Sequence, residues 1–271
     1  MSSQNNIEAS SPLVEIIMPN YNKGHFLEEA INSVINQKYK NWKLIIIDGA
    51  SLDESKNILA EFEKKFNNIN VVYLDKRENA AFARNLGIKL SKAEYIAFLD
   101  SDDYWVEDKL SEQISFMKKF NYDFTYTDYV PFYLSNGKKI FKKKVISPDS
   151  FTYDQFIYNT SIATSSMLIK KSIIGTIKCP DVKILEDYPF KCEILKTKCS
   201  AIKLKKILMY YRITENSLQS SKLRNVYWVW HINRKYNKLS LLKNIMSILM
   251  ISISSIKRYG IKLYYICFFT V

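Results

Sequence analysis

The chain has 271 residues, of which 47% are hydrophobic and 25% are charged, a composition close to that of ordinary globular domains. Its 40 Lys and Arg against 27 Asp and Glu give a formal net charge of +13. The aromatic content of 14% argues against intrinsic disorder, and six Gly with six Pro exclude a collagen-like or low-complexity protein. We therefore expect one large domain with a sizeable core.

The start of the chain and the cysteines suggest where the protein works. Residues 1–12 are polar and contain neither the basic nor the apolar region of a signal peptide, so we expect a loose tail there. The two histidines leave little material for a His-based metal site or catalytic triad. Four cysteines without CxxC spacing predict reduced thiols in a cytosolic protein: Cys179, Cys192, Cys199 and Cys267.

Four short apolar runs in the first hundred residues are typical of strands buried on both faces. Repeated strand–helix–strand units imply right-handed crossovers and a doubly wound, mainly parallel α/β sheet. Ligands of such sheets bind beyond the carboxyl ends of the strands. The expected strands are Val14–Met18, Lys43–Ile47, Asn70–Leu74 and Glu94–Leu99, and helical spacing separates them at residues 26–35, 58–66 (capped by Asp53) and 80–90.

The pattern changes after about Asn121. No internal repeat is present, and from Lys222 onward the spacing is helical. Between these points we expect strands at Asp123–Asp128, Ser165–Ile169 and Ile207–Ile213, a hairpin at Phe132–Phe141 turning at Asn136-Gly137, and a helix near Asp187–Lys196.

The densest group of acids is Asp100-Ser101-Asp102-Asp103, directly after an expected strand. Carboxylates crowded at a strand end repel one another unless a cation lies between them. Mg²⁺ and Mn²⁺ take oxygen ligands and commonly bridge one or two carboxylates to a diphosphate. The alternative is a solvated turn in which Asp103 caps the following helix.

Three further blocks precede the acids: Pro19-Asn20-Tyr21-Asn22, Asp48-Gly49-Ala50-Ser51-Leu52-Asp53 and Ala83-Arg84-Asn85-Leu86-Gly87. With these four blocks in order, residues 12–217 resemble glycosyltransferase family 2, the inverting sugar transferases of GT-A fold. The usual blocks of that family are P-x-Y-N, V-D-D-G-S-x-D, A-R-N-x-G and F-L-D-S-D-D. The resemblance implies a GT-A-like sheet that binds a nucleoside-diphosphate sugar.

The resemblance also implies roles for the nucleotide-binding loops. Pro19 and Tyr21 would line the base pocket, and Asp48 would contact a uracil-like base or its ribose. Arg84 would lie near the nucleotide or its diphosphate. Gly49 replaces the second acid of the family pattern and offers no side chain to the base. For Asp48 and Tyr21, ordinary turn and loop roles are the alternative.

A metal is implied by the same resemblance. Asp100 would face the ribose and the metal, and Asp102 would be the ligand of Mn²⁺ or Mg²⁺.

The second expected constellation is Glu186-Asp187 at the start of a helix. By resemblance Asp187 is the general base, and the segment Tyr210–Ser217 resembles the Y-R-x-x-x-x-S segment of the family. Inverting transfer needs one carboxylate to take the proton of the acceptor hydroxyl. We expect the neighbouring acid and partial burial to raise the pKa of Asp187. The alternative is an acidic helix N-terminus that favours the macrodipole.

Positive charge is concentrated at the end of the chain. Glu215 is the last acidic residue, and nine Lys and Arg follow it, so the last 56 residues carry +9 and the preceding 215 carry only +4. The apolar run Ile245–Ile256 is shorter than the roughly 20 residues that span a bilayer. We expect a basic amphipathic segment lying on an anionic leaflet. A helical pair packed on the catalytic domain and a nucleic-acid patch are the alternatives.

These observations divide the chain into a tail at residues 1–12, a nucleotide-sugar-binding half at 13–120, an acceptor-side half of the same domain at 121–217, and a basic helical extension at 218–271. The predicted function is metal-dependent transfer of a hexosyl or N-acetylhexosaminyl group, with inversion, from a UDP-linked donor to a glycan or lipid-linked hydroxyl. We expect a cytoplasmic protein, peripheral on the inner face of the cell membrane, with no specific nucleic-acid partner.

The same residues bear on three rival functions. A nucleotidyltransferase would bring a Gly-rich, basic loop after the first strand, and the sequence PNYNK at residues 19–23 is not one. A catalytically inactive sugar-nucleotide binder is disfavoured by the intact acids Asp100, Asp102 and Asp187. A basic nucleic-acid binder would show salt-sensitive binding to random DNA.

Overall fold

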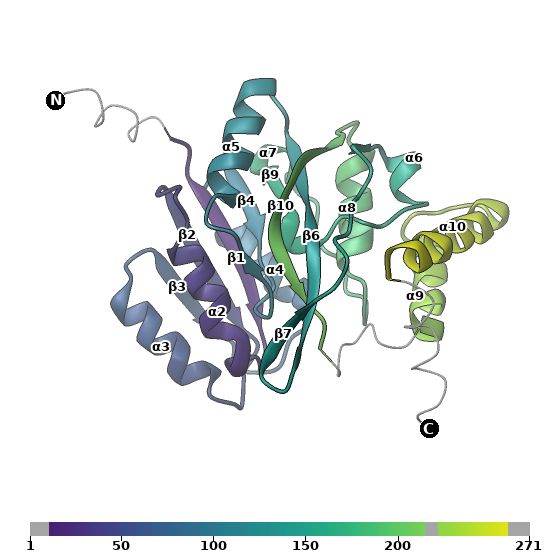
Figure 1. Cartoon of the computed structure of the whole chain (residues 1–271). Coiled ribbons are helices and arrows are strands. Elements are labelled where there is room, and N and C mark those ends of the chain that lie inside the picture. The colour runs from purple at the N-terminus through teal and green to yellow at the C-terminus, as the bar shows by residue number, and fades with distance from the viewer. Residues whose placement is uncertain (1–10, 215–221, 260–271) are drawn as a thin grey trace.

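One ten-stranded sheet with helices on both faces organises the computed structural model, which describes residues 11–214 and 222–259 (Figure 1). Four parallel strands in the order β3-β2-β1-β4 form its first half. The expected doubly wound arrangement is confirmed there. The strands are β1 (Val14–Asn20), β2 (Trp42–Asp48), β3 (Ile69–Tyr73) and β4 (Tyr95–Phe98), and the connecting helices are α2 (Gly24–Ile35), α3 (Ser55–Lys65) and α4 (Ala80–Leu90).

Side chains of β1 alternate between two cores because neighbouring strand residues point to opposite faces. Ile16 and Met18 pack with residues of α2, α3 and α5 (Lys109–Phe120), whereas Ile17 packs toward α4 and α8 (Asp187–Lys196). A Cβ at Gly87 of α4 would lie 2.5 Å from Cγ2 of Ile17. The glycine of the A-R-N-x-G block therefore lets this helix approach the sheet closely.

The second half of the sheet is mixed. Strand β9 runs antiparallel between β4 and β6, and β6 pairs in parallel with β10, whose other edge takes the short β5. The bounds are β5 (Tyr104–Trp105), β6 (Phe124–Ser135), β7 (Lys138–Phe141), β8 (Ser150–Phe151), β9 (Leu168–Lys170) and β10 (Ala201–Arg212), with short helices α6 (Tyr153–Phe156) and α7 (Lys171–Ile174).

Several expected elements differ in detail. The strand expected at Ser165–Ile169 is split into a 3₁₀ turn at Thr164–Ser166 followed by β9. The hairpin at Asn136-Gly137 is confirmed, and β10 begins six residues earlier than Ile207 because its first part pairs with β6. Helix α8 has the expected bounds, Asp187–Lys196.

The two expected caps also differ in outcome. Asp53 accepts the N–H of Ser55 at 3.1 Å at the start of α3 and also the N–H of Gly24 at 2.9 Å, so it ties α2 to α3. The prediction that Asp103 caps the following helix is wrong, because Asp103 is buried and β5 intervenes before α5 begins at Lys109.

The basic extension forms a hairpin of two helices, α9 (Lys222–Lys235) and α10 (Leu241–Tyr259), beside α8 (Figure 1). Val229, Ile232 and Leu239 are buried in the core that also holds α8. The alternative given for this extension, a helical pair packed on the domain, is therefore observed, and the expected contact with a membrane stays a prediction. Three expected segments lie outside the described residues: the tail at residues 1–10, the end of the Y-R segment at 215–217 and the last part of the basic extension at 260–271.

Buried polar side chains fix the hairpin to the domain. The Tyr188 hydroxyl donates to Oδ1 of Asn233 at 2.7 Å, and Asn233 Nδ2 donates to Asn244 Oδ1 and to Ser247 Oγ at 3.0 and 2.9 Å. Ser247 Oγ in turn donates to the carbonyl of Ile157 at 2.5 Å. Within residues 11–214 and 222–259, no helix is both long and apolar enough to cross a membrane.

Candidate active site

The loops that follow β1, β2 and β4 meet at the carboxyl edge of the parallel strands, as the sequence predicts. Asn20 and Asp48 are paired residues at the ends of β1 and β2. Asn20 Nδ2 donates to Asp48 Oδ1 at 2.8 Å. Asp48 also accepts the N–H and the hydroxyl of Ser51, at 3.0 and 2.6 Å, and is fully buried. In the structure Asp48 holds the turn together, and its contact with a nucleotide stays a prediction.

The same turn fixes the loop that carries Tyr21. Asn22 has a positive φ of 50°, its N–H donates to Ser51 Oγ at 2.9 Å, and its Oδ1 accepts the N–H of Leu52 at 2.8 Å. Pro19 lies half-buried just before this loop. The guanidinium of Arg77, in the loop after β3, lies 4.5 Å from the centroid of the Tyr21 ring. One face of Tyr21 is therefore covered by a cation.

Each acid after β4 has its own cationic or hydrogen-bonding partner. Asp100 pairs with Arg84 at 2.6 Å, and Asp102 pairs with Lys23 at 2.7 Å. Asp103 is buried, where it accepts the hydroxyl of Ser165 at 2.6 Å and the N–H of Arg212 at 2.9 Å. Burial, with Asp102 and Asp100 nearby, raises the pKa of Asp103. The mutual repulsion expected from the sequence is therefore offset by cations at Asp100 and Asp102, and it still acts on Asp103.

Arg212, in the Y-R segment at the end of β10, holds the acidic loop that follows β4. Its Nε donates to the carbonyl of Asp102 at 2.8 Å, and its Nη2 pairs with Glu29 of α2. The guanidinium also lies between the rings of Phe26 and Phe132, 4.4 and 4.5 Å from their centroids. The segment thus fixes the loop that carries Asp102.

Arg84 joins the two expected constellations. Its side chain is only 5% exposed, and its two terminal nitrogens pair with Asp100 after β4 and with Glu186 before α8. Burial alone would lower the pKa of Arg84, but Asp100 and Glu186 hold it well above its ordinary value. The donor-side acids and the helix with Asp187 are therefore linked by one buried cation.

Asp187 is the first residue of α8, and its side chain is 23% exposed. Its Oδ2 accepts the hydroxyl of Thr164 at 2.7 Å and pairs with Lys191 at 2.6 Å. Burial would raise its pKa, but Lys191 and Arg84 outweigh burial and lower the pKa of Asp187 to about 2. The expected rise of this pKa is therefore wrong, because Glu186 pairs with Arg84 and a lysine one turn along the helix faces the carboxylate.

The acidic loop after β4 offers oxygen ligands for a metal at this edge. Asp100 and Asp102 are 32% and 22% exposed, and each has one oxygen in an ion pair. Mg²⁺ and Mn²⁺ are usually held by one or two carboxylates plus substrate phosphates, and this donor set fits that pattern. Within the described ranges, no three His, Cys, Asp or Glu side chains are grouped to hold a metal by themselves.

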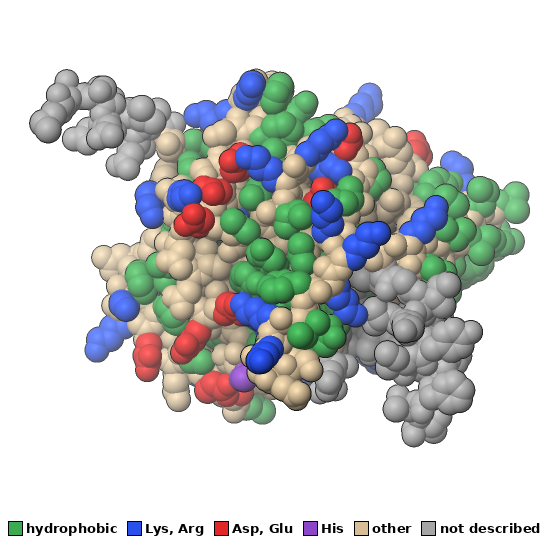
Figure 2. Space-filling view, viewed as in Figure 1, with side chains coloured by type: hydrophobic (Ala, Val, Ile, Leu, Met, Phe, Trp, Pro, Cys, Tyr) green, Lys and Arg blue, Asp and Glu red, His purple; other side chains and the backbone are tan. Residues whose placement is uncertain are grey.

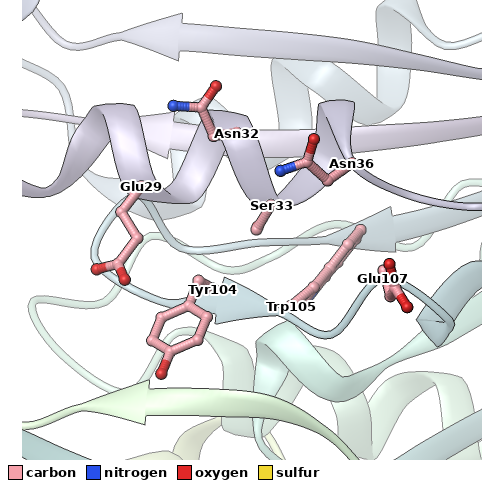
Figure 3. A pocket seen from close by; sticks show the side chains of 7 residues that line it. All are labelled: Glu29, Asn32, Ser33, Asn36, Tyr104, Trp105 and Glu107. Atoms are coloured by element: carbon pink, nitrogen blue, oxygen red, sulfur yellow. The ribbon is translucent and has the colours of Figure 1, made fainter.

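A hollow of about 570 Å³ lies between α2 and β5 (Figure 3). Its lining includes neither the acids of the loop after β4 nor Asp187. Tyr104 already stacks on Tyr210 at 4.7 Å, and the indole N–H of Trp105 donates to the carbonyl of Ser165. We assign it no ligand. Its lining residues are Glu29, Asn32, Ser33, Asn36, Tyr104, Trp105 and Glu107.

Three residues of the site carried no prediction. Lys23 belongs to a loop singled out in the sequence, but its pairing with Asp102 spans 79 residues. Thr164 is 23 residues from Asp187 in the chain. Lys191 is the one with a local signal, because an acid and a lysine four residues apart face each other on a helix.

Known proteins resemble the chain both in sequence and in fold. The family model for glycosyl transferase family 2 matches residues 15–177. TuaG of Bacillus subtilis (strain 168), named as a teichuronic acid biosynthesis glycosyltransferase, is 34% identical over 232 residues, which are 86% of this chain and 91% of that protein. The Escherichia coli UDP-Glc:alpha-D-GlcNAc-diphosphoundecaprenol beta-1,3-glucosyltransferase WfgD is 34% identical over 221 residues, 81% of this chain and 85% of that one.

Solved structures share the fold at low identity. Staphylococcus aureus TarS 1–349 in complex with UDP-GlcNAc has a TM-score of 0.67 at 17% identity, over 96% of this chain and 76% of that chain. The mannosyltransferase PcManGT of Pyrobaculum calidifontis, in complex with GDP-Man and Mn²⁺, has a TM-score of 0.66 at 12% identity, over 96% and 79%. The predicted GT-A-like fold is thereby confirmed.

Proposed function

The chain belongs to glycosyl transferase family 2 and is a glycosyltransferase, and on this premise we propose that it moves a sugar, with inversion and with help from a divalent metal, from a UDP-linked donor to a hydroxyl of a glycan or lipid-linked acceptor. The observation that carries the proposal is the ion-pair chain from Asp100 through Arg84 to Glu186. It sets the acids expected to face the donor beside the helix that begins with Asp187.

The donor would lie against the loops after β1, β2 and β4. We assign Tyr21 and Pro19 to contacts with the nucleobase, and Asp48 to the ordering of the loop that binds the nucleobase and the ribose. Asp100 and Arg84 are assigned to the ribose and the diphosphate. The relatives' names and complexes support a uridine donor, since WfgD is named for UDP-Glc and TarS was solved with UDP-GlcNAc. Gly49, which replaces the second acid of the family pattern, offers no side chain to the nucleobase. Its backbone N–H donates to the carbonyl of Asn20 at 2.8 Å, so it serves the turn between the two loops.

Asp102 would hold Mn²⁺ or Mg²⁺, with Asp100 beside it. A bound divalent ion offsets the negative charge that grows on the departing diphosphate. Lys23 occupies Oδ2 of Asp102 in the structure, so it has to release that oxygen or share the carboxylate when the ion binds. Once released, its ammonium group lies next to where the diphosphate is proposed.

Asp187 would act as the general base. The acceptor oxygen forms its bond to the anomeric carbon as the bond from that carbon to the diphosphate breaks. The hydroxyl proton passes to the carboxylate of Asp187, and the nucleoside diphosphate leaves. Inversion follows from this single displacement. The lowered pKa of Asp187 keeps its carboxylate ionised at neutral pH, which is the form that can accept a proton.

The donor half is tested by calorimetry of UDP binding with and without Mn²⁺. Asp102→Asn should abolish the tightening by Mn²⁺ while leaving the circular dichroism spectrum unchanged. Equal metal enhancement in the variant and the parent would refute the assignment of Asp102.

The base is tested by turnover. Asp187→Asn should bind UDP as the parent does but lose roughly 10²–10⁴-fold in kcat, the span typical of lost general acid–base catalysis. A fully active Asp187→Asn enzyme would place the base elsewhere.

The acceptor and the place of action are proposed together. The name of WfgD includes a diphosphoundecaprenol acceptor, and an enzyme with such a substrate works at a membrane surface. We assign the membrane contact to the outward face of α10, where hydrophobic side chains gather on the surface (Figure 2). Leu242, Leu249 and Ile253 on this face are 76%, 56% and 45% exposed. The complete face consists of two adjacent rows along the helix, and within each row the residues are spaced four apart. The first row is Leu241, Ile245, Leu249 and Ile253, and the second is Leu242, Met246 and Met250.

Charge favours an anionic leaflet over a second copy of the chain on this face. The helices α9 and α10 contain seven Lys and Arg and no acid. A symmetric dimer through α10 would bring two such sets of charges together, whereas a basic residue near anionic lipid gains about 1 kcal/mol. Sedimentation with vesicles containing anionic lipid, partly reversed by high salt and weak with neutral vesicles, is the expected result. Equal binding to both lipids would refute the charge assignment.

A further inference from the structure

Lys191 is the least exposed charged group around Asp187, with 2% of its side chain accessible. A buried ammonium is costly unless all three of its N–H groups are used. Lys191 meets this condition, because Nζ donates to Asp187 Oδ2 at 2.6 Å, to the carbonyl of Ile162 at 2.8 Å and to Thr164 Oγ1 at 3.0 Å. The three acceptors fix the position of the nitrogen.

The two oxygens of Asp187 are thereby made different. Oδ2 accepts from both Lys191 and Thr164. Among the described residues no hydrogen bond to Oδ1 is seen, and the Asp187 side chain as a whole is 23% exposed. One oxygen is therefore anchored, and the other is left for an incoming hydroxyl.

We propose that Lys191 is a positioning residue for sugar transfer: with Thr164 it holds Oδ2 of Asp187, so that Oδ1 is aimed at the acceptor hydroxyl and the carboxylate stays ionised. This inference rests on the proposed role of Asp187 as the base. It adds a residue that the sequence motifs do not contain, and it states which oxygen of Asp187 takes the proton.

The surrounding charges cannot replace Lys191. Arg84, on α4, lies on the same side but its two terminal nitrogens already pair with Asp100 and Glu186. Cys179 is a further titratable neighbour among the described residues, and burial raises the pKa of its thiol to about 12, so it stays neutral. Without Lys191, the hydrogen bond from Thr164 and the more distant charge of Arg84 would be left to favour the ionised carboxylate.

The loss of Lys191 should therefore have two separate effects. A carboxylate that moves by about 1 Å from its productive position costs about 100-fold in rate. A buried carboxylate that loses its nearest cation gains a proton more readily. The first effect lowers kcat at every pH, and the second makes kcat fall further as the pH is lowered.

The test compares Lys191→Met, Lys191→Arg and Lys196→Met in the full chain. Lys196 lies on the same helix and forms an exposed pair with Glu193 at 2.6 Å, so its loss is a matched control. We expect Lys191→Met to bind UDP normally and to lose about 10- to 100-fold in kcat at pH 7.5. Between pH 7.5 and pH 5 the kcat of Lys191→Met should fall by a further factor of about three or more, whereas the kcat of the parent and of Lys196→Met should not change.

Lys191→Arg separates charge from position. It should keep the flat pH profile because the cation remains, and its kcat should lie between those of the parent and Lys191→Met because the nitrogens are displaced. Carbon-13 NMR of the Asp187 carboxyl provides a readout without turnover: above pH 4 it should titrate in Lys191→Met but not in the parent.

Each outcome bears on one proposal. If Asp187→Asn is inactive and Lys191→Met keeps the kcat and pH profile of the parent, the positioning role is refuted while the base stands. If Asp187→Asn is active, the base assignment itself fails. If Lys191→Met does not fold, Lys191→Arg decides alone, and parental kcat in that variant would overturn the role in aiming the carboxylate.

Discussion

Replacing Leu242 and Leu249 by serine removes apolar surface from the outward face of α10 without touching its packed face. Burying a whole leucine side chain is worth roughly 1.5–3 kcal/mol. Their exposed fractions of 76% and 56% are what a bilayer could still cover. The pair therefore accounts for about 2–4 kcal/mol of membrane affinity, which corresponds to a loss of about 30-fold to several-hundred-fold in the partition coefficient.

Vesicle sedimentation measures this loss directly. The parent, the double variant and Leu90→Ser are titrated with vesicles containing anionic lipid. Leu90 is 45% exposed at the end of α4, so its replacement removes apolar surface of the same kind, in smaller amount, away from the hairpin and should change binding by less than about twofold. The urea midpoints of all three should agree. If the double variant binds vesicles as tightly as Leu90→Ser does, α10 is not the membrane contact.

Two further predictions concern stability. Arg84→Met should lower the free energy of unfolding by about 3 kcal/mol, the lower end for breaking a buried pair because Asp100 can still be hydrated; a urea midpoint equal to that of the parent would contradict it. The second concerns Lys109, which is fully buried, and burial lowers its pKa from 10.5 to about 7. Between these values the unfolded chain binds the extra proton, so Lys109 adds about 2 kcal/mol of stability on going from pH 7 to pH 9. The parent should therefore gain about 2 kcal/mol more over this interval than Lys109→Met does, as urea unfolding of both at the two pH values would reveal.

The nucleotide-side loops were predictable because parallel strands place their carboxyl ends at one edge. Asp48, Asp100 and the loop after Asn20 each follow an apolar run directly, so their meeting required only the strands and the right-handed crossover. Gly87 is predictable from the sequence only as part of the A-R-N-x-G motif. Its physical reason, the close approach of Gly87 to Ile17, needed the packing of helix on strand.

The electrostatics of the base could not be predicted in the same way. The sequence places Glu186 next to Asp187, and neighbours of like charge suggest a raised pKa. In the fold Glu186 pairs with Arg84, which is 102 residues away in the chain, while Lys191 and Thr164 face Asp187. The sign of the shift depended on which partner each carboxylate found, and two of those partners are distant in sequence.

The two alternatives for the basic extension are compatible because a helix has two faces. One side of α10 carries Asn244 and Ser247, which are buried and hydrogen-bonded to α9 and to the domain. The opposite side carries the exposed apolar rows. Because Asn233 also accepts from Tyr188, the residue next to Asp187, deleting α10 would disturb the polar network that reaches the helix of the proposed base. Substitution on the outward face perturbs membrane contact alone, so an effect of Leu242→Ser on turnover with a soluble acceptor would show that the two faces are coupled.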